Sequence, residues 1–259
     1  MNLKAAGVKE LLVISQDTAA YGVDKRYKLD FACGRPVHTK LIDLCRELGR
    51  LDLWTRLHYV YPYPHVDDIV PLMAEGLILP YLDVPFQHAH PRILKLMKRP
   101  ACGEKNLERI AAWRRACPDI TIRSTFIVGF PGETREDFEK TLELVRRTKY
   151  SALFTFIYSR RSGTAAEKLP DPIPAEEKSR WFRELLDTQG AIGSELLKNY
   201  VGKTLRVLAE DEGKTPGTLS CRAEDNTIVE VAAPPEMIGE FLQVRITAAM
   251  NWALRGERI

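Results

Sequence analysis

The chain has 259 residues, of which 45% are hydrophobic and 28% charged, and its net charge at pH 7 is +3. This composition is typical of a globular protein with one large domain, or one large and one small domain. No apolar run approaches the roughly 18 residues that a membrane helix needs. The first residues also lack the pattern of a secretory signal. We therefore expect no membrane association and a cytoplasmic location.

Five cysteines, Cys33, Cys45, Cys102, Cys117 and Cys221, are scattered along the chain. No two of them have CxxC spacing, whereas metal sites and disulfide frameworks group their cysteines more tightly. The pattern predicts ordinary thiols in a reducing compartment and no bound metal.

The first two-thirds of the chain alternates β-like runs with amphipathic helical stretches. The predicted strands are Glu10–Ser15, Trp54–Val60, Leu79–Val84, Thr121–Val128 and Leu153–Tyr158. The predicted helices are Thr39–Leu51, Glu104–Ala116 and Glu136–Thr148, where apolar residues recur at spacings of three and four. Such alternation predicts an α/β fold with a parallel sheet, either open or closed into a full or partial barrel.

The last third of the chain has a different character. Three prolines in Leu169–Ala175 predict a linker, and a long helix follows Pro174. We expect its buried side to comprise Phe182, Leu185, Leu186, Gln189, Ile192, Leu196 and Tyr200. After Gly202, the alternating runs Thr204–Ala209, Thr227–Val231 and Phe241–Thr247 predict a small antiparallel, OB-like β-barrel. The expected boundaries are 1–168 for the β/α part, 169–199 for linker and helix, and 200–259 for the barrel.

The segment Thr121–Glu133 is the sharpest candidate for chemistry. A β-like run ends at Gly129, and Gly132 and Glu133 follow it. Glycine at the carboxyl end of a parallel strand lets the backbone approach a ligand closely. A tight strand–helix turn without a ligand explains the pattern equally well, and Thr134 with Asp137 forms a variant of the capping box that would open the next helix.

Four other segments also follow predicted strands. In Ser15–Thr18, Gln16 faces a ligand or Asp17 caps the next turn, and capping is slightly favoured. In Pro85–His88, Gln87 is able to bond a ribose or an amide, while His88 is more often structural. Tyr59–His65 favours packing over a pocket wall. Ser159–Thr164, with two arginines, suits a carboxylate or phosphate or else forms a solvated turn. Together the five segments predict one site at one rim.

Long runs of the sequence resemble radical S-adenosylmethionine (SAM) methylthiotransferases. WTRLHYVYPYPHVDD, LPYLDVPFQHAHPRILKLMKRP and IRSTFIVGFPGETREDF, within residues 1–140, are similar to the RimO branch. FTFIYSRRSGT and VRITAAMNWALRGE, within residues 141–259, are more similar to the MiaB branch. Residues from about 198 resemble a TRAM domain. The resemblance covers nearly the whole chain and implies a partial radical-SAM β/α barrel followed by TRAM.

The resemblance also implies an activity and its cofactors. RimO-like enzymes add a methylthio group to an aspartate of a small-subunit ribosomal protein, and MiaB-like enzymes add it to isopentenyladenosine beside the tRNA anticodon. Both branches use SAM, one 4Fe-4S cluster held by CxxxCxxC, and a second cluster held by three further cysteines. These motifs are absent here, so we expect an N-terminally truncated form that is inactive alone, with no catalytic residue assigned. The chain would then leave Glu10–Ser15 as an unpaired edge strand.

Seven residues carry over from the family's SAM site. They are Gln16, Gln87, Arg123, Ser124, Ile127, Gly129 and Glu133. Two other functions stay open. A non-catalytic module would bind SAM or a macromolecule without turnover. A cofactor-free β/α enzyme is less favoured, because no lysine or metal ligands stand convincingly at the strand ends.

The charge of the expected barrel bears on the partner. Residues 198–259 carry 8 Lys/Arg and 9 Asp/Glu, a net charge of −1, with an acidic run at Glu210-Asp211-Glu212. RNA binding favours an excess of cations, whereas a basic ribosomal protein suits a neutral or acidic surface. We therefore expect the ribosomal protein rather than tRNA. A basic stripe of Lys203, Arg206, Arg222 and Arg245 would support tRNA instead.

Overall fold

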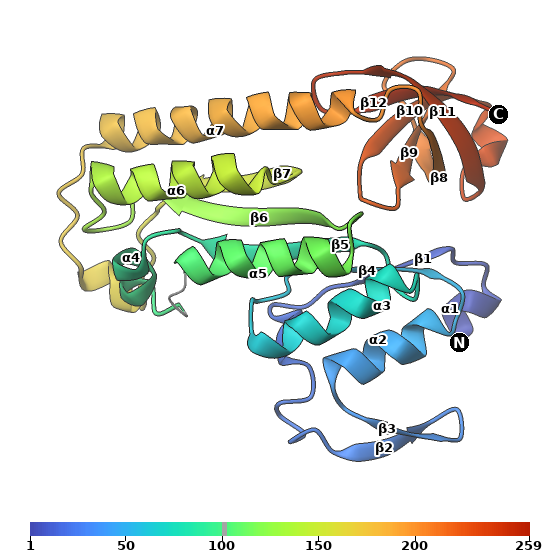
Figure 1. Ribbon diagram of the computed structural model, residues 1–259, viewed down its shortest axis with the longest axis horizontal. Coiled ribbons are helices and arrows are strands. Elements are labelled where there is room, and N and C mark those ends of the chain that lie inside the picture. The colour runs from blue at the N-terminus through green and yellow to red at the C-terminus, as the bar shows by residue number, and fades with distance from the viewer. Residues whose placement is uncertain (100–102) are drawn as a thin grey trace. The chain divides into compact units, whose positions relative to one another are not determined.

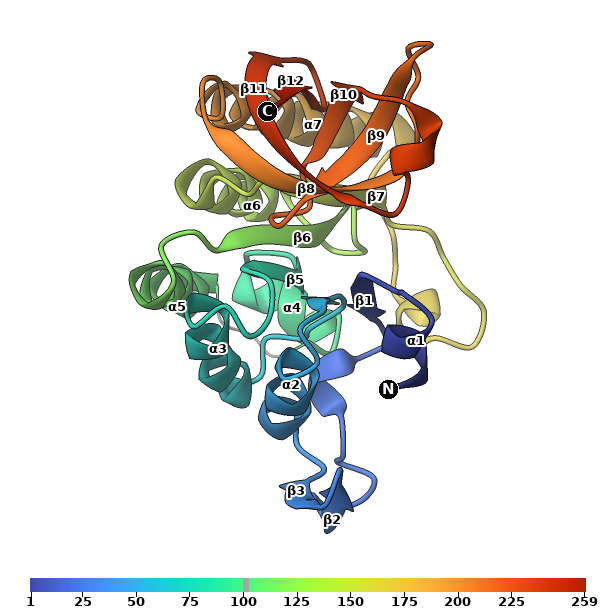
Figure 2. The same cartoon turned by 90° about the vertical axis from the view of Figure 1, so that its right-hand side faces the viewer.

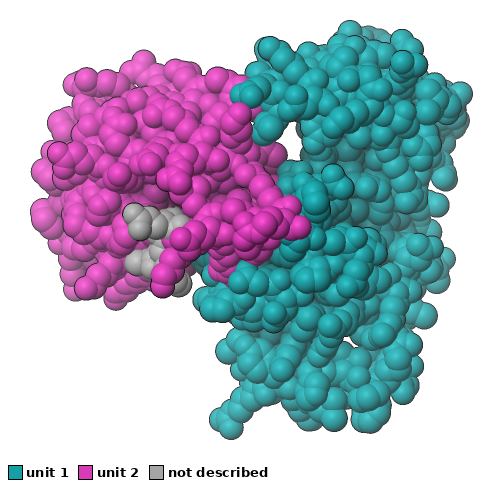
Figure 3. Space-filling view, in the orientation of Figure 1, with its two compact units in different colours: residues 1–83, 116–121, 194–259 teal, residues 84–115, 122–193 magenta. Residues whose placement is uncertain are grey.

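The computed structural model describes residues 1–99 and 103–259, so Cys102 lies outside the described residues. The chain divides into two compact units, which Figure 3 shows in teal and magenta. Unit 1 comprises residues 1–83, 116–121 and 194–259, and unit 2 comprises 84–115 and 122–193. Within the described part of the chain, no helix is long and apolar enough to cross a membrane.

Unit 1 contains three parallel strands in the order β1, β4, β5. They are β1 (Glu10–Val13), β4 (Trp54–Leu57) and the first residues of β5 (Tyr81–Gln87). The helices of this part are α1 (Asn2–Ala5), η1 (Thr18–Ala20), α2 (Leu41–Gly49), η2 (Pro64–Ile69) and α3 (Val70–Ala74). β1 ends this order and pairs with β4 alone among the described strands, which confirms the predicted edge strand (Figure 1).

A hairpin that the periodicity did not predict lies between β1 and α2. Its strands are β2 (Leu29–Ala32) and β3 (Arg35–His38), which pair only with each other among the described strands. Cys33 and Gly34 join the strands with φ angles of 51° and 76°. Two residues with positive φ make the type I′ turn that suits a two-residue hairpin loop. Strands of four residues are too short to give a clear alternating pattern.

Unit 2 continues the parallel arrangement in the order β5, β6, β7. Its strands are the end of β5, β6 (Thr121–Val128) and β7 (Ala152–Ile157), with α4 (Pro91–Leu96), α5 (Gly103–Ala116), α6 (Arg135–Thr148) and η3 (Ala165–Lys168). Thr134 and Asp137 form the predicted capping box at the start of α6. The parallel strands and their helices confirm the predicted α/β class.

In the parallel sheet, the predicted ends of β4 and β5 are each wrong by three residues, for local reasons. β5 runs on through Pro85 to Gln87, because all seven of its residues are buried and packing outweighs the missing amide of the proline. β4 stops at Leu57 rather than at Val60, because Tyr59 has a φ of 54°, which ends an extended strand.

The long helix after the proline linker is α7 (Ala175–Lys198). Its predicted buried side is partly wrong. Trp181 is buried where Phe182 was expected, and Leu186 is 41% exposed. Trp181 stacks on Phe138 of α6 with ring centroids 5.3 Å apart, whereas Leu185, Gln189 and Ile192 are buried as predicted. The buried residues are Lys178, Trp181, Leu185, Gln189 and Ile192.

The C-terminal strands close into a barrel of order β10-β12-β11-β8-β9, seen in red in Figure 2. They are β8 (Thr204–Glu212), β9 (Thr218–Ala223), β10 (Ile228–Ala232), β11 (Phe241–Ala249) and β12 (Leu254–Arg258), with η4 (Pro235–Met237). The OB-like barrel is thus confirmed, although only three of these strands were predicted, and β10 pairs with β12 in parallel rather than antiparallel as expected. Glu210–Glu212 belong to β8, because that strand runs past the predicted end at Ala209.

Candidate functional site

The parallel pair β6–β7 in unit 2 has one covered face and one open face. Ser124 and Phe126 are fully buried, and the Phe126 ring lies 5.7 Å from the Tyr150 ring. On the opposite face, which we call the open face, lie Arg123, Ile127, Phe154 and Phe156. Phe154 and Phe156 are 42% and 54% exposed.

Aromatic and charged groups meet on this open face. The Arg123 guanidinium lies 4.4 Å from the centroid of the Phe154 ring. Register places Ile127 beside Phe156 at the carboxyl end of the pair. A flat purine is able to lie on such apolar side chains, and a guanidinium suits a carboxylate. The open face therefore combines an apolar, aromatic surface with one cation beside it.

The turn after β6 depends on a close contact with α7. Gly129 has a φ of 71°, and a Cβ there would lie 2.6 Å from Cγ and 2.7 Å from Cδ of Lys178. Lys178 Nζ lies 2.5 Å from Asp171 Oδ2, and both residues are largely buried. Glycine is thus required by packing as well as by backbone conformation. The backbone conformation and the contact with Lys178 therefore explain Gly129 without a bound ligand.

A buried histidine–glutamate pair fixes the same turn. His88 Nδ1 accepts a hydrogen bond from the His90 amide at 2.9 Å, so Nε2 carries the proton and donates to Glu133 Oε1 at 2.9 Å. Glu133 Oε2 accepts from the Phe130 amide at 3.0 Å. Both side chains are fully buried. His88 and Glu133 therefore join the end of β5 to the β6–α6 turn, which makes their role structural.

Ser124 and Gln87 occupy different positions from Arg123 and Ile127. Ser124 Oγ accepts from the Phe86 amide at 3.3 Å on the covered face. Gln87 ends β5 with a φ of 69° and is 8% exposed. A glutamine in the left-handed region is strained, and such strain is frequent at ligand sites. Gln87 thus remains a candidate ligand contact because of its backbone conformation. Ser124 instead forms a hydrogen bond between neighbouring strands of the sheet.

Gln16 lies in unit 1, exposed in the loop after β1. The neighbouring Asp17 caps η1 by accepting from the Ala19 amide at 3.1 Å, as predicted. Tyr63 donates to Asp17 Oδ2 at 3.0 Å, and His65 Nε2 donates to the Ala19 carbonyl at 2.8 Å. The aromatic segment Tyr59–His65 therefore packs against this loop and holds it in place.

The arginine segment after β7 is a solvated turn. Arg160 and Arg161 are exposed, and Thr164 Oγ1 donates to the Arg161 carbonyl at 2.8 Å. The Gly163 amide donates to Glu167 Oε2 at 2.8 Å. These local bonds complete the turn without an anion.

Three of the described cysteines, Cys45, Cys117 and Cys221, are poorly suited to hold an iron–sulfur cluster. Iron–sulfur clusters are held mainly by cysteine thiolates. Burial raises the pKa of Cys45 to about 12 and that of Cys221 to about 11, and it also raises the pKa of Cys117. Among the described residues, no three histidine, cysteine, aspartate or glutamate side chains form a group able to hold a metal.

Sequence reasoning missed several residues around the site. Phe154 and Phe156 were assigned to a strand but not to a face, although the alternation in FTFIY carries that signal. The buried pair Lys178–Asp171 joins α7 to the linker before it, and no local pattern marks it. Glu133 was chosen as a ligand contact, and its bond to His88 emerges only from the fold.

The chain matches two family models, the radical SAM superfamily over residues 2–145 and the TRAM domain over residues 198–259. The first match covers more than half of the chain, which therefore belongs to the radical SAM superfamily. Among solved structures, coproporphyrinogen III oxidase (HemN) of Escherichia coli, a radical SAM enzyme, is 18% identical with a TM-score of 0.48. That alignment covers 77% of this chain and 50% of HemN, and a similarity of this size carries no argument here.

Curated relatives are much closer in sequence. The ribosomal protein uS12 methylthiotransferase RimO of Chromobacterium violaceum is 51% identical over 99% of this chain and 60% of that protein. RimO of Aromatoleum aromaticum is 52% identical over 95% of this chain and 56% of that protein. RimO of Aeromonas salmonicida is 48% identical over 97% and 58%. The chain thus spans somewhat over half the length of these relatives.

Replacing Gly129 by alanine tests the contact with α7. We expect Gly129→Ala to lower the free energy of unfolding by about 2–4 kcal/mol, because backbone strain adds to the clash with Lys178. Gly132→Ala is the matched control. Gly132 has a φ of 82°, but a Cβ there meets its nearest atom at 3.8 Å, so we expect strain alone, about 1–2 kcal/mol. Urea unfolding measures both.

The clash can be separated from the strain in a second background. In Lys178→Ala, the added cost of Gly129→Ala should fall toward that of Gly132→Ala, since the Cγ and Cδ atoms of Lys178 are gone and only its Cβ, 3.1 Å away, remains. An unchanged cost in that background would show that Lys178 does not impose the glycine.

Proposed function

We propose that this chain is the SAM-holding and partner-recognising portion of a RimO-type uS12 methylthiotransferase. The observation that carries the proposal is the 51% identity with the Chromobacterium violaceum enzyme across 99% of the chain. The enzyme's iron–sulfur clusters would be held by residues other than these 259, because the five cysteines of the chain do not have CxxxCxxC spacing. The domain boundaries 1–168, 169–199 and 200–259 remain part of the proposal.

The open face supports the SAM half of the proposal. Arg123, Ile127 and the exposed Phe154 and Phe156 offer a carboxylate partner and a surface for a purine. In this proposal Gly129, which directly follows β6, is a further SAM contact. In this proposal Gln87, at the end of β5, supplies a polar contact, and Gln16, in the loop after β1, is kept as a candidate on its sequence position alone. Glu133 and Ser124 act indirectly, by fixing the turn and the sheet.

The barrel supports a protein partner over tRNA. Two members of the possible basic stripe are already engaged. Arg222 Nε lies 2.8 Å from Glu210 Oε2, and the Arg206 guanidinium lies 4.0 Å from the Phe241 ring centroid and 5.7 Å from that of Trp54. Asp211 and Glu212 remain exposed on β8. Such a surface suits a basic ribosomal protein, and uS12 is the substrate that the relatives' names give.

A second candidate is a MiaB-like action on tRNA. The sequence motifs within residues 141–259 that resemble the MiaB branch favour it. The engaged arginines of the barrel count against it. With uS12 as the partner, we propose a cytoplasmic location, where ribosomal proteins are made and assembled. A module that binds without catalysis remains the alternative if no cluster is supplied from outside.

SAM binding tests the placement of the site. We expect the chain alone to bind SAM weakly and Arg123→Gln to weaken that binding about tenfold or more, since a bond to a charged group is lost. Calorimetric titration measures it, with Arg147→Gln, an exposed arginine of α6, as the control. Gly129 is unsuitable for this test because its substitution also disturbs Lys178. Tight binding that Arg123→Gln leaves unchanged would refute the placement.

A further inference from the structure

The hairpin formed by β2 and β3, with the residues leading into and out of it, is a surface that the proposed function does not use. Within residues 21–40, which we call the hairpin surface, most side chains are exposed. In Figures 1 and 2 the hairpin stands out from unit 1 beyond α2. The hairpin surface is therefore accessible to a binding partner.

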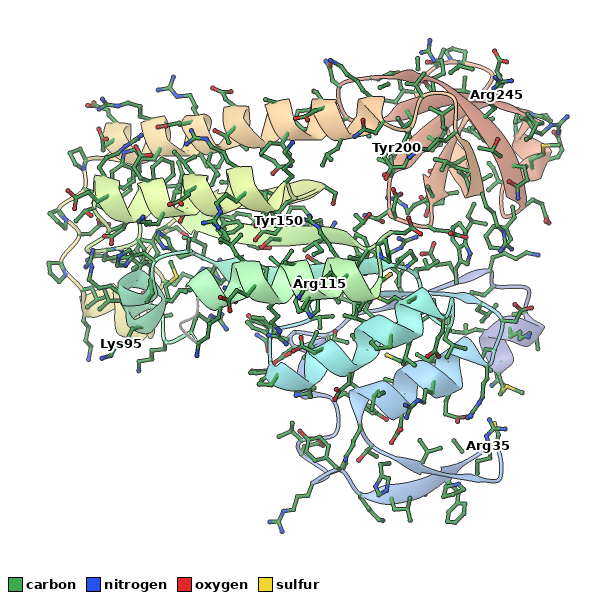
Figure 4. All side chains as sticks on the ribbon, in the orientation of Figure 1. Arg35, Lys95, Arg115, Tyr150, Tyr200 and Arg245 are labelled. Carbon is green, nitrogen blue, oxygen red and sulfur yellow. The ribbon has the colours of Figure 1, made fainter. Side chains whose placement is uncertain are left out.

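The two faces of the hairpin differ. Ala32 pairs with Arg35, and Arg35 forms an ion pair with Glu47 of α2 at 2.6 Å, so this face lies toward α2 (Figure 4). On the other face, Leu29 pairs with His38 and Phe31 pairs with Pro36. Leu29 is 48% exposed and Phe31 is 71% exposed. The outer face therefore presents an apolar and aromatic stripe to solvent.

Aromatic rings and cations alternate around this stripe. Tyr21 and Tyr27 are 41% and 39% exposed, and Lys40 Nζ lies 5.7 Å from the Tyr27 ring centroid. The hairpin surface carries five Lys or Arg and two Asp, a net charge of +3 in twenty residues. Exposed rings provide stacking platforms for bases, and cations beside them neutralise phosphates.

The base of the hairpin is fixed rather than loose. Gly22 has a φ of 81°, and a Cβ there would lie 1.6 Å from the Thr39 carbonyl oxygen. The Tyr27 amide donates to the Gly22 carbonyl at 3.0 Å, and the Thr39 amide donates to the Lys28 carbonyl at 3.0 Å. His38 Nδ1 donates to the Tyr27 carbonyl at 3.2 Å. The rings and cations are therefore held in a defined arrangement before any partner binds.

We propose that the hairpin surface binds RNA, with bases stacked on Phe31 and Tyr27 and phosphates beside Arg26 and Lys28. A polyanion is favoured over a basic protein because a net charge of +3 would repel the latter. This inference does not depend on the proposed SAM site or on the partner of the barrel. It places an RNA contact on the β/α part of the chain, away from the residues of the C-terminal barrel.

Fluorescence anisotropy of the full chain with a labelled single-stranded RNA of about 16 nucleotides tests the proposal. We expect Phe31→Ala to weaken binding about 5- to 100-fold, as the loss of one stacked base does. The double variant Arg26→Ala/Lys28→Ala should weaken binding and lower the slope of log affinity against log salt by about 1.4, since two phosphate contacts are lost. These side chains are exposed, so the thermal midpoint should stay that of the parent.

Matched controls come from elsewhere on the surface. Trp252→Ala removes an exposed aromatic ring from the β11–β12 turn, and Arg180→Ala/Arg183→Ala removes two exposed cations from α7. Both should bind the RNA as the parent does. Controls that lose as much affinity as the hairpin variants would overturn the proposal, and so would a Phe31→Ala chain with parental affinity. Loss of uS12 binding by the hairpin variants, with RNA binding intact, would identify the surface as a protein contact instead.

Discussion

Replacing Arg56 by methionine is expected to lower the free energy of unfolding by about 3–5 kcal/mol, the largest effect of any single substitution considered. The Arg56 side chain on β4 is fully buried, and its Nε lies 2.7 Å from Glu10 Oε1 on β1. Its other nitrogens donate to the carbonyls of Glu224 and Ala223 at 2.8 and 3.1 Å. Methionine fills much of the volume but leaves the buried Glu10 carboxylate without its partner.

Two variants show whether the lost charge partner is the cause. Arg56→Met combined with Glu10→Gln should recover part of the stability, because the unpaired charge is then gone. Arg115→Met, at an exposed arginine of α5 labelled in Figure 4, should change the stability by no more than about 0.5 kcal/mol. Denaturant unfolding measures all three. A loss for Arg56→Met no greater than that for Arg115→Met would contradict the buried bonds.

Anaerobic reconstitution of the chain with iron and sulfide is expected to leave it at the iron content of an untreated sample. The superfamily's CxxxCxxC is absent, and Cys45, Cys117 and Cys221 are buried with raised pKa values. A buried neutral thiol is a poor iron ligand because the thiolate is the form that binds. Iron counting and visible absorption after desalting give the result.

A variant without the exposed Cys33 serves as the control, because adventitious iron would bind there first. Cys33→Ser should leave the iron content unchanged. A cluster that survives desalting and changes its redox state with SAM would mean that the chain holds cluster ligands that the sequence pattern does not reveal.

Periodicity predicted the parallel strands and the major helices because their apolar spacing is local information. It missed β2, β3, β9 and β12. Four- and five-residue strands give too few alternations, and the closure of the barrel decides β9 and β12 through pairs such as Val229 with Cys221 and Val229 with Leu254. β5 was cut short at Pro85, since its burial on both faces is a tertiary property.

The candidate site was predictable in part. The strand-end rule led to Gly129, and family resemblance led to Arg123 and Ile127, which register places on one open face with Phe154. The pairing of His88 with Glu133 joins residues 45 positions apart, so no local pattern reveals it. Lys178 likewise reaches Gly129 from a helix that follows the linker. Contacts between distant segments decide which polar residues bind a ligand and which hold the turn.

We propose that this chain supplies the SAM-holding and uS12-directed part of a methylthiotransferase. The most direct test fuses it to the part of the Chromobacterium violaceum relative that it does not match, loads the fusion with iron and sulfide, and offers uS12 and tRNA together. Mass spectrometry of both substrates reads the outcome, with an Arg123→Gln fusion as the matched control. We expect a methylthio group on uS12, little on tRNA, and a reduced yield with Arg123→Gln. A cluster-loaded, folded fusion that modifies only tRNA, or neither substrate, would contradict it.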